Sequence, residues 1–141
     1  MKAANLLKLV YISKRMTIGV YESLIRLDPI EEKIEEFMRE EGKHTMMAVK
    51  RLDELGLRTP KRSGEIAERL GETLGRAAGF LGWKGVCLFM GIGEETERLF
   101  LKAASKVCRN ENDREILNLI IFDGKKHGEW WRSKLSQRRQ H

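Results

Sequence analysis

The stretch Ile30-Glu-Glu-Lys-Ile-Glu-Glu-Phe-Met-Arg-Glu-Glu-Gly-Lys-His44 decides the fold. Its apolar residues recur at spacings of four and three, the period of one face of an α-helix, and this face continues to Ala48 and Leu52. Glu41 and His44 interrupt the face, although ionisable groups are costly to bury unless they are paired or bound to a metal. The stretch therefore predicts a long helix with a polar site on its core-facing side.

Start and stop signals around this stretch predict further helices. Asp28-Pro29-Ile30-Glu31 contains a capping residue, a proline suited to the first helical position and a glutamate three residues after the cap. A tight turn there should follow a helix over residues 3–27, and Gly56 should end the second helix. We expect a short helix over about 64–80 with Ser63 as its cap, and long helices over about 84–107 and 113–136.

Apolar stripes indicate which side of each helix should be buried. The first stripe is Leu7, Tyr11, Ile18, Tyr21 and Ile25; the short helix has Ile66, Leu70 and Leu74; and the helix over 84–107 has Leu88, Ile92, Glu95, Leu99, Ala103 and Val107. No segment alternates as a strand would. The chain should be an all-α, antiparallel four-helix bundle, with one extra short helix between the second and third long helices.

The length of 141 residues fits a single domain over 1–141, and 41% hydrophobic with 34% charged residues is a globular balance. Cys87 and Cys108 should lie roughly 30 Å apart on one helix at ~1.5 Å per residue, so they cannot pair within the chain. That spacing, with no visible signal peptide, favours a cytoplasmic protein. The glycine-rich residues 77–93 are interrupted by Lys84 and suggest a buried hairpin or one at a membrane surface, rather than a span.

Two more helices interrupt their stripes at mid-length. We expect Glu95 on the buried face of one, with Glu94 and Glu97 alongside, and His127 on the buried face of the last, with Asp123 one turn earlier. Each signal has an ordinary alternative: a chance Glu-x-x-His, a hydrogen-bonded core histidine, or a solvated acidic face. Carboxylates and imidazoles from three helices, however, are what di-iron and di-manganese centres in bundles are made of, so we expect these side chains to meet at one point.

Four motifs resemble, in order and spacing, those of the demethoxyubiquinone hydroxylase family in the ferritin-like superfamily. They are Met38-Arg-Glu-Glu-Gly-Lys-His44, Leu74-Gly-Arg-Ala-Ala-Gly-Phe-Leu-Gly-Trp-Lys-Gly-Val-Cys87, Gly91-Ile-Gly-Glu-Glu-Thr-Glu97 and Phe122-Asp-Gly-Lys-Lys-His127. The resemblance covers roughly residues 5–131. It implies a di-iron centre that activates O2, hydroxylation of a quinone-like ring and attachment at a membrane surface. By position, the implied metal ligands are Glu41, His44, Glu95 and His127, with Glu94 and Asp123 as further candidates.

The chain departs from the family's pattern at two positions. The first helix should supply a glutamate level with Glu41, but reflection through the turn near residues 27–28 places Lys14 there. Gly124 stands where the last helix should carry its final glutamate. The site could be an ion cluster in which Lys14 replaces metal charge, or it could keep one metal with Lys14 and Tyr21 behind the ligands.

These features leave several functions open. One is an iron enzyme, with manganese not excluded, that oxidises or hydroxylates a small quinone-like substrate. Another is a metal-free bundle that associates as a homo-oligomer, such as a dimer, or contacts the inner face of a membrane. The net charge of +6 includes basic residues at both ends of the chain, but beyond the C-terminal tail, which can equally be a solvated helix end, no basic-aromatic motif supports a nucleic-acid partner.

Overall fold

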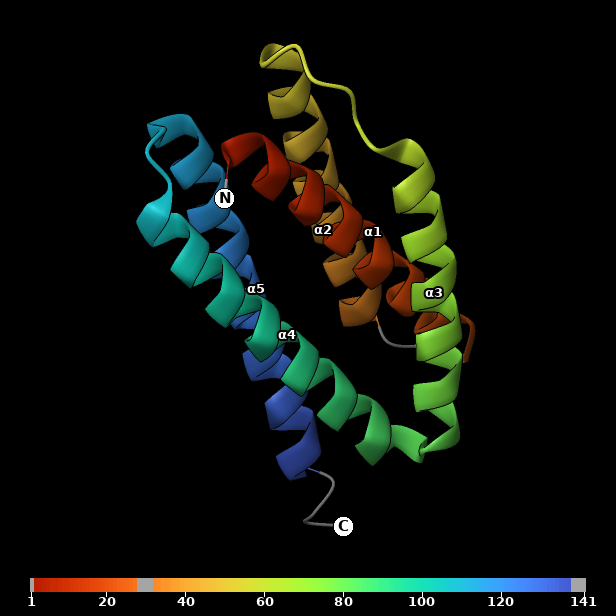
Figure 1. The fold of residues 1–141 in the computed structure, drawn as a ribbon. Coiled ribbons are helices and arrows are strands. Elements are labelled where there is room, and N and C mark those ends of the chain that lie inside the picture. The colour runs from red at the N-terminus through yellow and green to blue at the C-terminus, as the bar shows by residue number, and fades with distance from the viewer. Residues whose placement is uncertain (1, 28–31, 138–141) are drawn as a thin grey trace. The chain divides into compact units, whose positions relative to one another are not determined.

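The described residues form helices and the short segments that join them. The fold is that of a computed structural model, which describes residues 2–27 and 32–137. Within these ranges there are five helices and no strand, which confirms the expected all-α class (Figure 1). The helices are α1 Ala3–Leu27, α2 Glu32–Glu54, α3 Lys61–Phe80, α4 Gly82–Val107 and α5 Glu111–Gln137.

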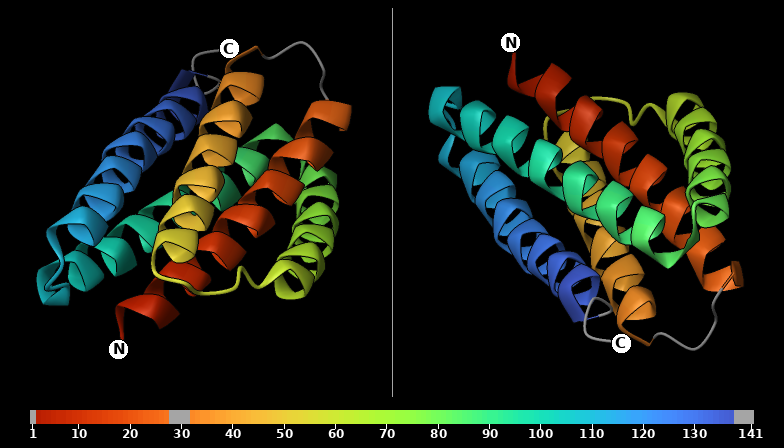
Figure 2. Two further views of the ribbon diagram at one scale, coloured as in Figure 1. Left: turned by 90° about the horizontal axis from the view of Figure 1, so that it is seen from above. Right: turned by 90° about the horizontal axis from the view of Figure 1, so that it is seen from below.

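The chain divides into two compact units, Met1–Ala77 and Ala78–His141. In the first unit α1 packs beside α2, and in the second α4 packs beside α5 (Figure 2). The single domain expected over residues 1–141 stays a prediction.

The ends of α1 and α2 follow the sequence signals. α1 covers residues 3–27 as predicted, while the capping sequence at 28–31 lies outside the described residues. Beyond α2, Gly56 has a φ of 71°, the left-handed conformation that favours glycine. Its N–H donates to the Asp53 carbonyl at 2.9 Å, and the Leu57 N–H donates to the Leu52 carbonyl at 2.9 Å. These two bonds form a Schellman motif, which confirms Gly56 as the stop.

α3 differs from the prediction in its start and in its buried face. It begins at Lys61, directly after Pro60, so Ser63 lies inside its first turn and is not the cap. The expected stripe is wrong, because Ile66 and Leu70 are exposed. In the first unit the buried positions of α3 are small residues, namely Gly64, Ala67, Gly71 and Gly75.

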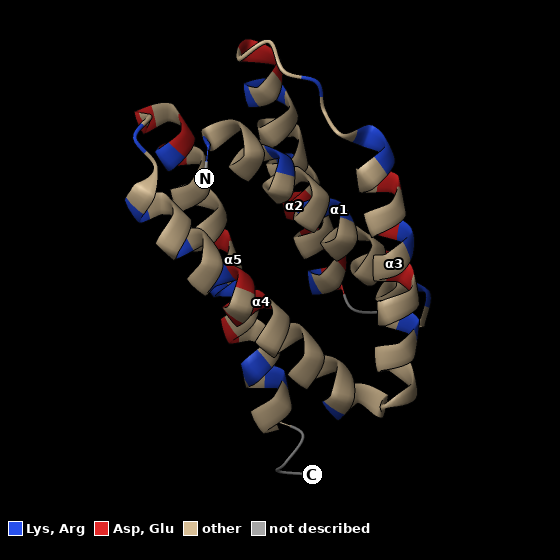
Figure 3. Ribbon diagram, viewed as in Figure 1, with Lys and Arg blue, Asp and Glu red and all other residues tan. Residues whose placement is uncertain are grey.

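Small residues let α3 approach α1 closely. A Cβ atom built on Gly71 would overlap the Met16 carbonyl oxygen, and one on Gly75 would lie 2.8 Å from the Ser23 Cβ. The Ser23 hydroxyl donates to the Glu72 carbonyl at 2.7 Å. Away from this contact, acidic and basic residues are interspersed along α3 (Figure 3). The helix is therefore held by backbone proximity rather than by a row of large apolar side chains.

Aromatic side chains hold α4 against α5 in the second unit. Trp131 is completely buried, and its ring centroid lies 5.9 Å from that of Trp83 and 4.8 Å from that of Trp130. α5 begins after Asn110, whose side-chain oxygen accepts a hydrogen bond from the Asp113 N–H at 3.2 Å, as a helix cap does. No helix of the described residues combines the length and the apolar character needed to cross a membrane.

Candidate functional site

In the first unit Lys14 of α1 meets Glu41 of α2. The Lys14 Nζ lies 2.8 Å from the Glu41 Oε2, and the two side chains are 1% and 0% exposed. The reflection argument placed these residues at one level, and this contact confirms it. An ammonium and a carboxylate at this distance form an ion pair, and both side chains are almost completely shielded from water.

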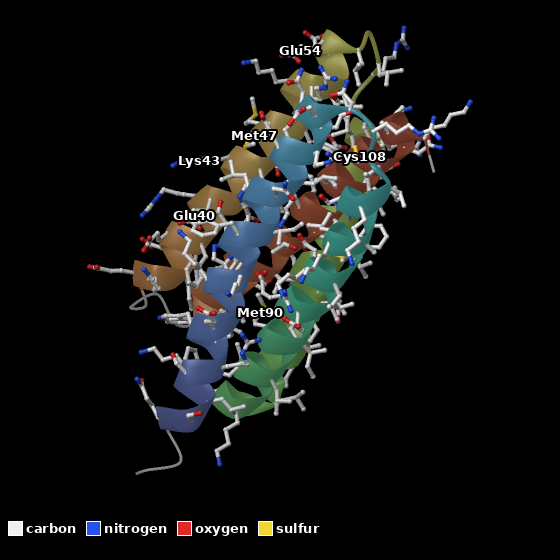
Figure 4. All side chains as sticks on the ribbon, turned by 90° about the vertical axis from the view of Figure 1, so that its left-hand side faces the viewer. Glu40, Lys43, Met47, Glu54, Met90 and Cys108 are labelled. Atoms are coloured by element: carbon white, nitrogen blue, oxygen red, sulfur yellow. The ribbon has the colours of Figure 1, made fainter. Side chains whose placement is uncertain are left out.

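His44 stands one turn after Glu41 on the same buried face of α2. Its Nδ1 lies 3.7 Å from the Glu41 Oε2, the same oxygen that Lys14 contacts. The labelled Glu40 and Lys43, their sequence neighbours, mark this level of α2 in Figure 4. A separation of 3.7 Å is too long for a hydrogen bond between the two atoms, so Lys14 lies closer to that oxygen than His44 does.

The charge of Lys14 determines whether the Glu41 carboxylate is available to a metal ion. A buried carboxylate needs a positive partner, because transfer of a lone ion from water into the interior costs several kcal/mol or more. The Lys14 ammonium supplies that charge. It offers no lone pair, so it cannot itself ligate a metal while it is protonated.

In the second unit Glu94 of α4 faces His127 of α5. Both are buried, and the Glu94 Oε1 lies 3.6 Å from the His127 Nδ1. Met90, labelled in Figure 4, lies one turn before Glu94 and is also buried. Two ligand atoms on one ion, with bonds of about 2.1 Å, lie roughly 3.0–3.5 Å apart, close to this separation. The pair could therefore supply two of the ligands of a divalent cation.

Gly124 lies beside this second pair. A Cβ atom built on Gly124 would lie 3.6 Å from the Glu94 Oε2, an ordinary van der Waals contact. Gly124 is thus the position from which an additional α5 side chain would approach the Glu94 carboxylate. The sequence had marked the same residue as the place of a missing acidic ligand.

Glu95 is not on the buried face of α4, so that expectation is wrong. Its side chain is 39% exposed, and Arg98 donates to both of its carboxylate oxygens, at 2.9 and 2.6 Å. The hydrogen bonds from Arg98 hold the pKa of Glu95 below its usual value. The buried glutamate is Glu94, one position earlier. A shift of one residue turns a helix by about 100°, so the choice between neighbouring glutamates decides which face they occupy.

The remaining candidates have their own neighbours. The Asp123 side chain is 16% exposed and lies 3.7 Å from the Lys126 Nζ, so it is not fully in the core. Tyr21 is completely buried, and its ring packs edge-on against Phe37 at 6.4 Å. Tyr21 is seven residues from Lys14, about 10 Å along the helix at ~1.5 Å per residue. Its ring therefore belongs to the apolar packing of α1 on α2.

One group of acidic residues did not follow from the apolar stripes. Glu22 of α1 meets Glu68 and Glu72 of α3, with one carboxylate oxygen of each within 4.8 Å of the others. Burial and the two neighbouring carboxylates raise the pKa of Glu22. The i, i+4 spacing of Glu68 and Glu72 was the available signal, but the sequence did not show that α1 would face them.

A scan against models of known families, a search of curated proteins and a search of solved structures each found no match. The resemblance to demethoxyubiquinone hydroxylases therefore depends on the motifs alone. Each unit contributes one buried carboxylate–imidazole pair, Glu41 with His44 and Glu94 with His127. That the expected side chains meet at one point stays a prediction.

Proposed function

We propose that the chain is a ferritin-like four-helix bundle in which the Lys14 ammonium takes the place of metal charge. In this proposal the protein acts by associating with other molecules rather than by activating O2. The observation that carries it is the 2.8 Å contact between the Lys14 Nζ and the Glu41 Oε2, with both groups buried.

Electrostatics favours this proposal over a di-iron centre. Two unit charges 4 Å apart interact by about 4 kcal/mol at an effective dielectric constant near 20, so a divalent ion at that distance from an ammonium meets about 8 kcal/mol of repulsion. A metal on Glu41 would have to overcome this repulsion or displace Lys14. The Lys14 ammonium already neutralises the charge of the Glu41 carboxylate, which is what a bound metal ion does in a metalloprotein.

Gly124 supports the same conclusion in the second unit. The α5 position that approaches Glu94 carries no side chain, so it supplies no carboxylate there. Oxygen-activating di-iron sites are built from several glutamates and Glu-x-x-His motifs on facing helices. At these two positions the chain has a lysine and a glycine.

Metal analysis tests the proposal. Protein purified without chelator and reconstituted with Fe²⁺ or Mn²⁺ should retain less than about 0.1 ion per chain. Lys14→Glu should raise metal retention, because it replaces the ammonium with a ligand level with Glu41. Lys14→Met is the matched control, since it removes the charge and adds no ligand. About one tightly held ion per wild-type chain, together with O2 consumption, would contradict the proposal.

A second candidate is a single divalent cation held by Glu94 and His127, which their 3.6 Å separation favours. Co²⁺ absorption distinguishes the two functions. A visible ligand-field band in the wild type that disappears in His127→Gln would support the second candidate. A band that survives in His127→Gln but disappears in Glu41→Gln would instead place the ion on the first pair and contradict both functions.

A further inference from the structure

The side of α4 that turns away from Glu94 carries a long uncharged surface. Its stripe consists of Leu88, Ile92, Thr96, Leu99, Ala103 and Val107, all of them exposed. Five of its six members belong to the stripe that the sequence predicted as the buried face of the helix; Thr96 stands where that prediction had Glu95. Ile92 is 61% and Leu99 is 55% exposed. α4 is therefore apolar on two sides, a property of helices that are covered all round.

The stripe is as large as the largest apolar patches that monomeric proteins expose. It runs from Leu88 to Val107, a rise of about 28 Å at ~1.5 Å per residue, and a helix is about 10 Å wide, which gives a footprint of roughly 300 Å². Apolar patches of this size often have a function in binding. Figure 3 shows the correspondingly long uncharged stretches of the α4 ribbon.

A groove in the second unit runs beside this stripe. Its volume is about 370 Å³, and it is lined by Leu88, Ile92, Thr96 and Leu99 of α4 with Leu135 of α5. This space can accept apolar side chains from a partner.

Charges at the edge of the groove are already compensated within the unit. Glu95 accepts two hydrogen bonds from Arg98, and the Arg132 Nη1 lies 3.8 Å from the Glu95 Oε2. An apolar partner could therefore cover the groove without leaving a new unpaired charge.

The spacing of the stripe fits a second copy of the same helix. The intervals between successive members are 4, 4, 3, 4 and 4, which read the same in both directions. An antiparallel copy therefore places every stripe residue opposite another. The pairs are Leu88 with Val107, Ile92 with Ala103, and Thr96 with Leu99. Large side chains then oppose smaller ones, as interdigitated helices require.

We infer that this face of α4 is the contact surface of a homodimer, in which the α4 helices of two copies pack antiparallel. The contact is isologous, since the same stripe serves both copies. This inference uses none of the observations on metal binding, because the stripe lies on the side of α4 opposite Glu94.

Solution mass tests the inference. The full chain should sediment at about 50 µM with twice its mass of 16.3 kDa. Ile92→Glu should weaken association by about 100-fold or more, because a charge would be buried in the contact. Met46→Glu on α2 is the matched control, since Met46 is 65% exposed and lies outside the stripe. Circular dichroism should report the same helix content for all three proteins.

Cross-linking tests the geometry without depending on the glutamate variants. Thr96→Cys should link to its copy with a reagent of about 10 Å reach, since the two sites would be three residues apart along antiparallel axes. Leu88→Cys should not link, because its copies would lie about 28 Å apart.

Three results would overturn the inference. The first is a wild-type protein with the mass of one chain, whether or not it binds anionic vesicles. The second is a dimer that Ile92→Glu leaves intact, and the third is efficient linking of Leu88→Cys.

Discussion

Lys14 and Glu41 compensate each other in a place where neither charge is hydrated. The side chains are 1% and 0% exposed, and 2.8 Å separates their charged atoms. Such a pair is held together mainly by the cost of separating it, because the loss of one partner leaves the other as a lone buried charge.

The first prediction follows from that asymmetry. Lys14→Met keeps the length and apolar stem of the side chain but leaves the Glu41 carboxylate without its ammonium. The free energy of unfolding should fall by about 3–5 kcal/mol. Urea unfolding followed by circular dichroism measures it. The double variant Lys14→Met with Glu41→Leu should recover most of the loss, since it removes both charges. A single variant as stable as the wild type would show that the ion pair is not what keeps Glu41 buried.

Contact between α1 and α3 depends on the absence of side chains at a few positions. Gly71 faces the backbone of α1 at Met16, whereas Gly42 of α2 has open space around the place of its Cβ. Both residues lie inside helices, where alanine is intrinsically the better residue by roughly 0.5–1 kcal/mol. Replacement of glycine by alanine should therefore destabilise the protein at position 71 and stabilise it at position 42.

The second prediction compares these two glycines. Gly71→Ala should destabilise the protein by about 2 kcal/mol, because the added methyl group can fit only if the α3 backbone moves away from α1. Gly42→Ala should stabilise it by roughly 0.5–1 kcal/mol. Thermal unfolding of both variants measures the difference. Equal effects in the two variants would mean that α3 does not pack against α1 at this distance.

The carboxylates between α1 and α3 supply the third prediction. Burial and the neighbouring Glu68 and Glu72 raise the pKa of Glu22, so the folded state binds this proton more tightly than the unfolded state. Unfolding then releases a proton, and stability falls as the pH rises above the unfolded value of about 4.5. Glu22→Gln should therefore stabilise the protein at pH 7 by a few tenths of a kcal/mol. This gain in stability should become smaller as the pH is lowered towards 4. Melting temperatures of the wild type and the variant between pH 4 and pH 7 measure it. A gain that does not change with pH would contradict the prediction.

The helices could be predicted from the sequence better than the faces they bury. Periodicity and the Gly56 stop gave most helix bounds closely, since they depend on local chemistry. The buried faces of α3 and α4 were predicted wrongly, for different reasons. α3 is buried through small residues such as Gly71, which carry almost no hydrophobic signal, and α4 is apolar on two sides. Periodicity finds an apolar side but cannot tell which partner, within the chain or outside it, will cover that side.

Local pairing at the site could likewise be predicted only in part. Lys14 and Glu41 were placed together by counting residues from one turn, and the 2.8 Å contact bears this out. Glu94 and Glu95 could not be separated in this way, because both stand near the edge of an apolar arc. The choice between them depends on where α5 lies, which brings His127 to Glu94 and Arg132 towards Glu95.

Over the whole chain, the aromatic residues divide between the two units. The three tryptophans, at 83, 130 and 131, all lie in Ala78–His141, and the two tyrosines, at 11 and 21, both lie in Met1–Ala77. Tryptophan fluorescence therefore reports on the second unit alone, and helical circular dichroism reports on both. The chain thus carries its own probes of whether its units unfold as one body.

The fourth prediction concerns the single domain that the sequence leads us to expect. Coincident transitions by different probes are the mark of cooperative two-state unfolding. If residues 1–141 form one domain, urea titrations followed by tryptophan fluorescence and by circular dichroism should have the same midpoint. Lys14→Met should then shift both curves equally, although Lys14 lies in the unit that contains no tryptophan. Two independent domains would instead leave the fluorescence midpoint of Lys14→Met at the wild-type value. The variant therefore tests domain unity with a substitution and a probe that lie in different units.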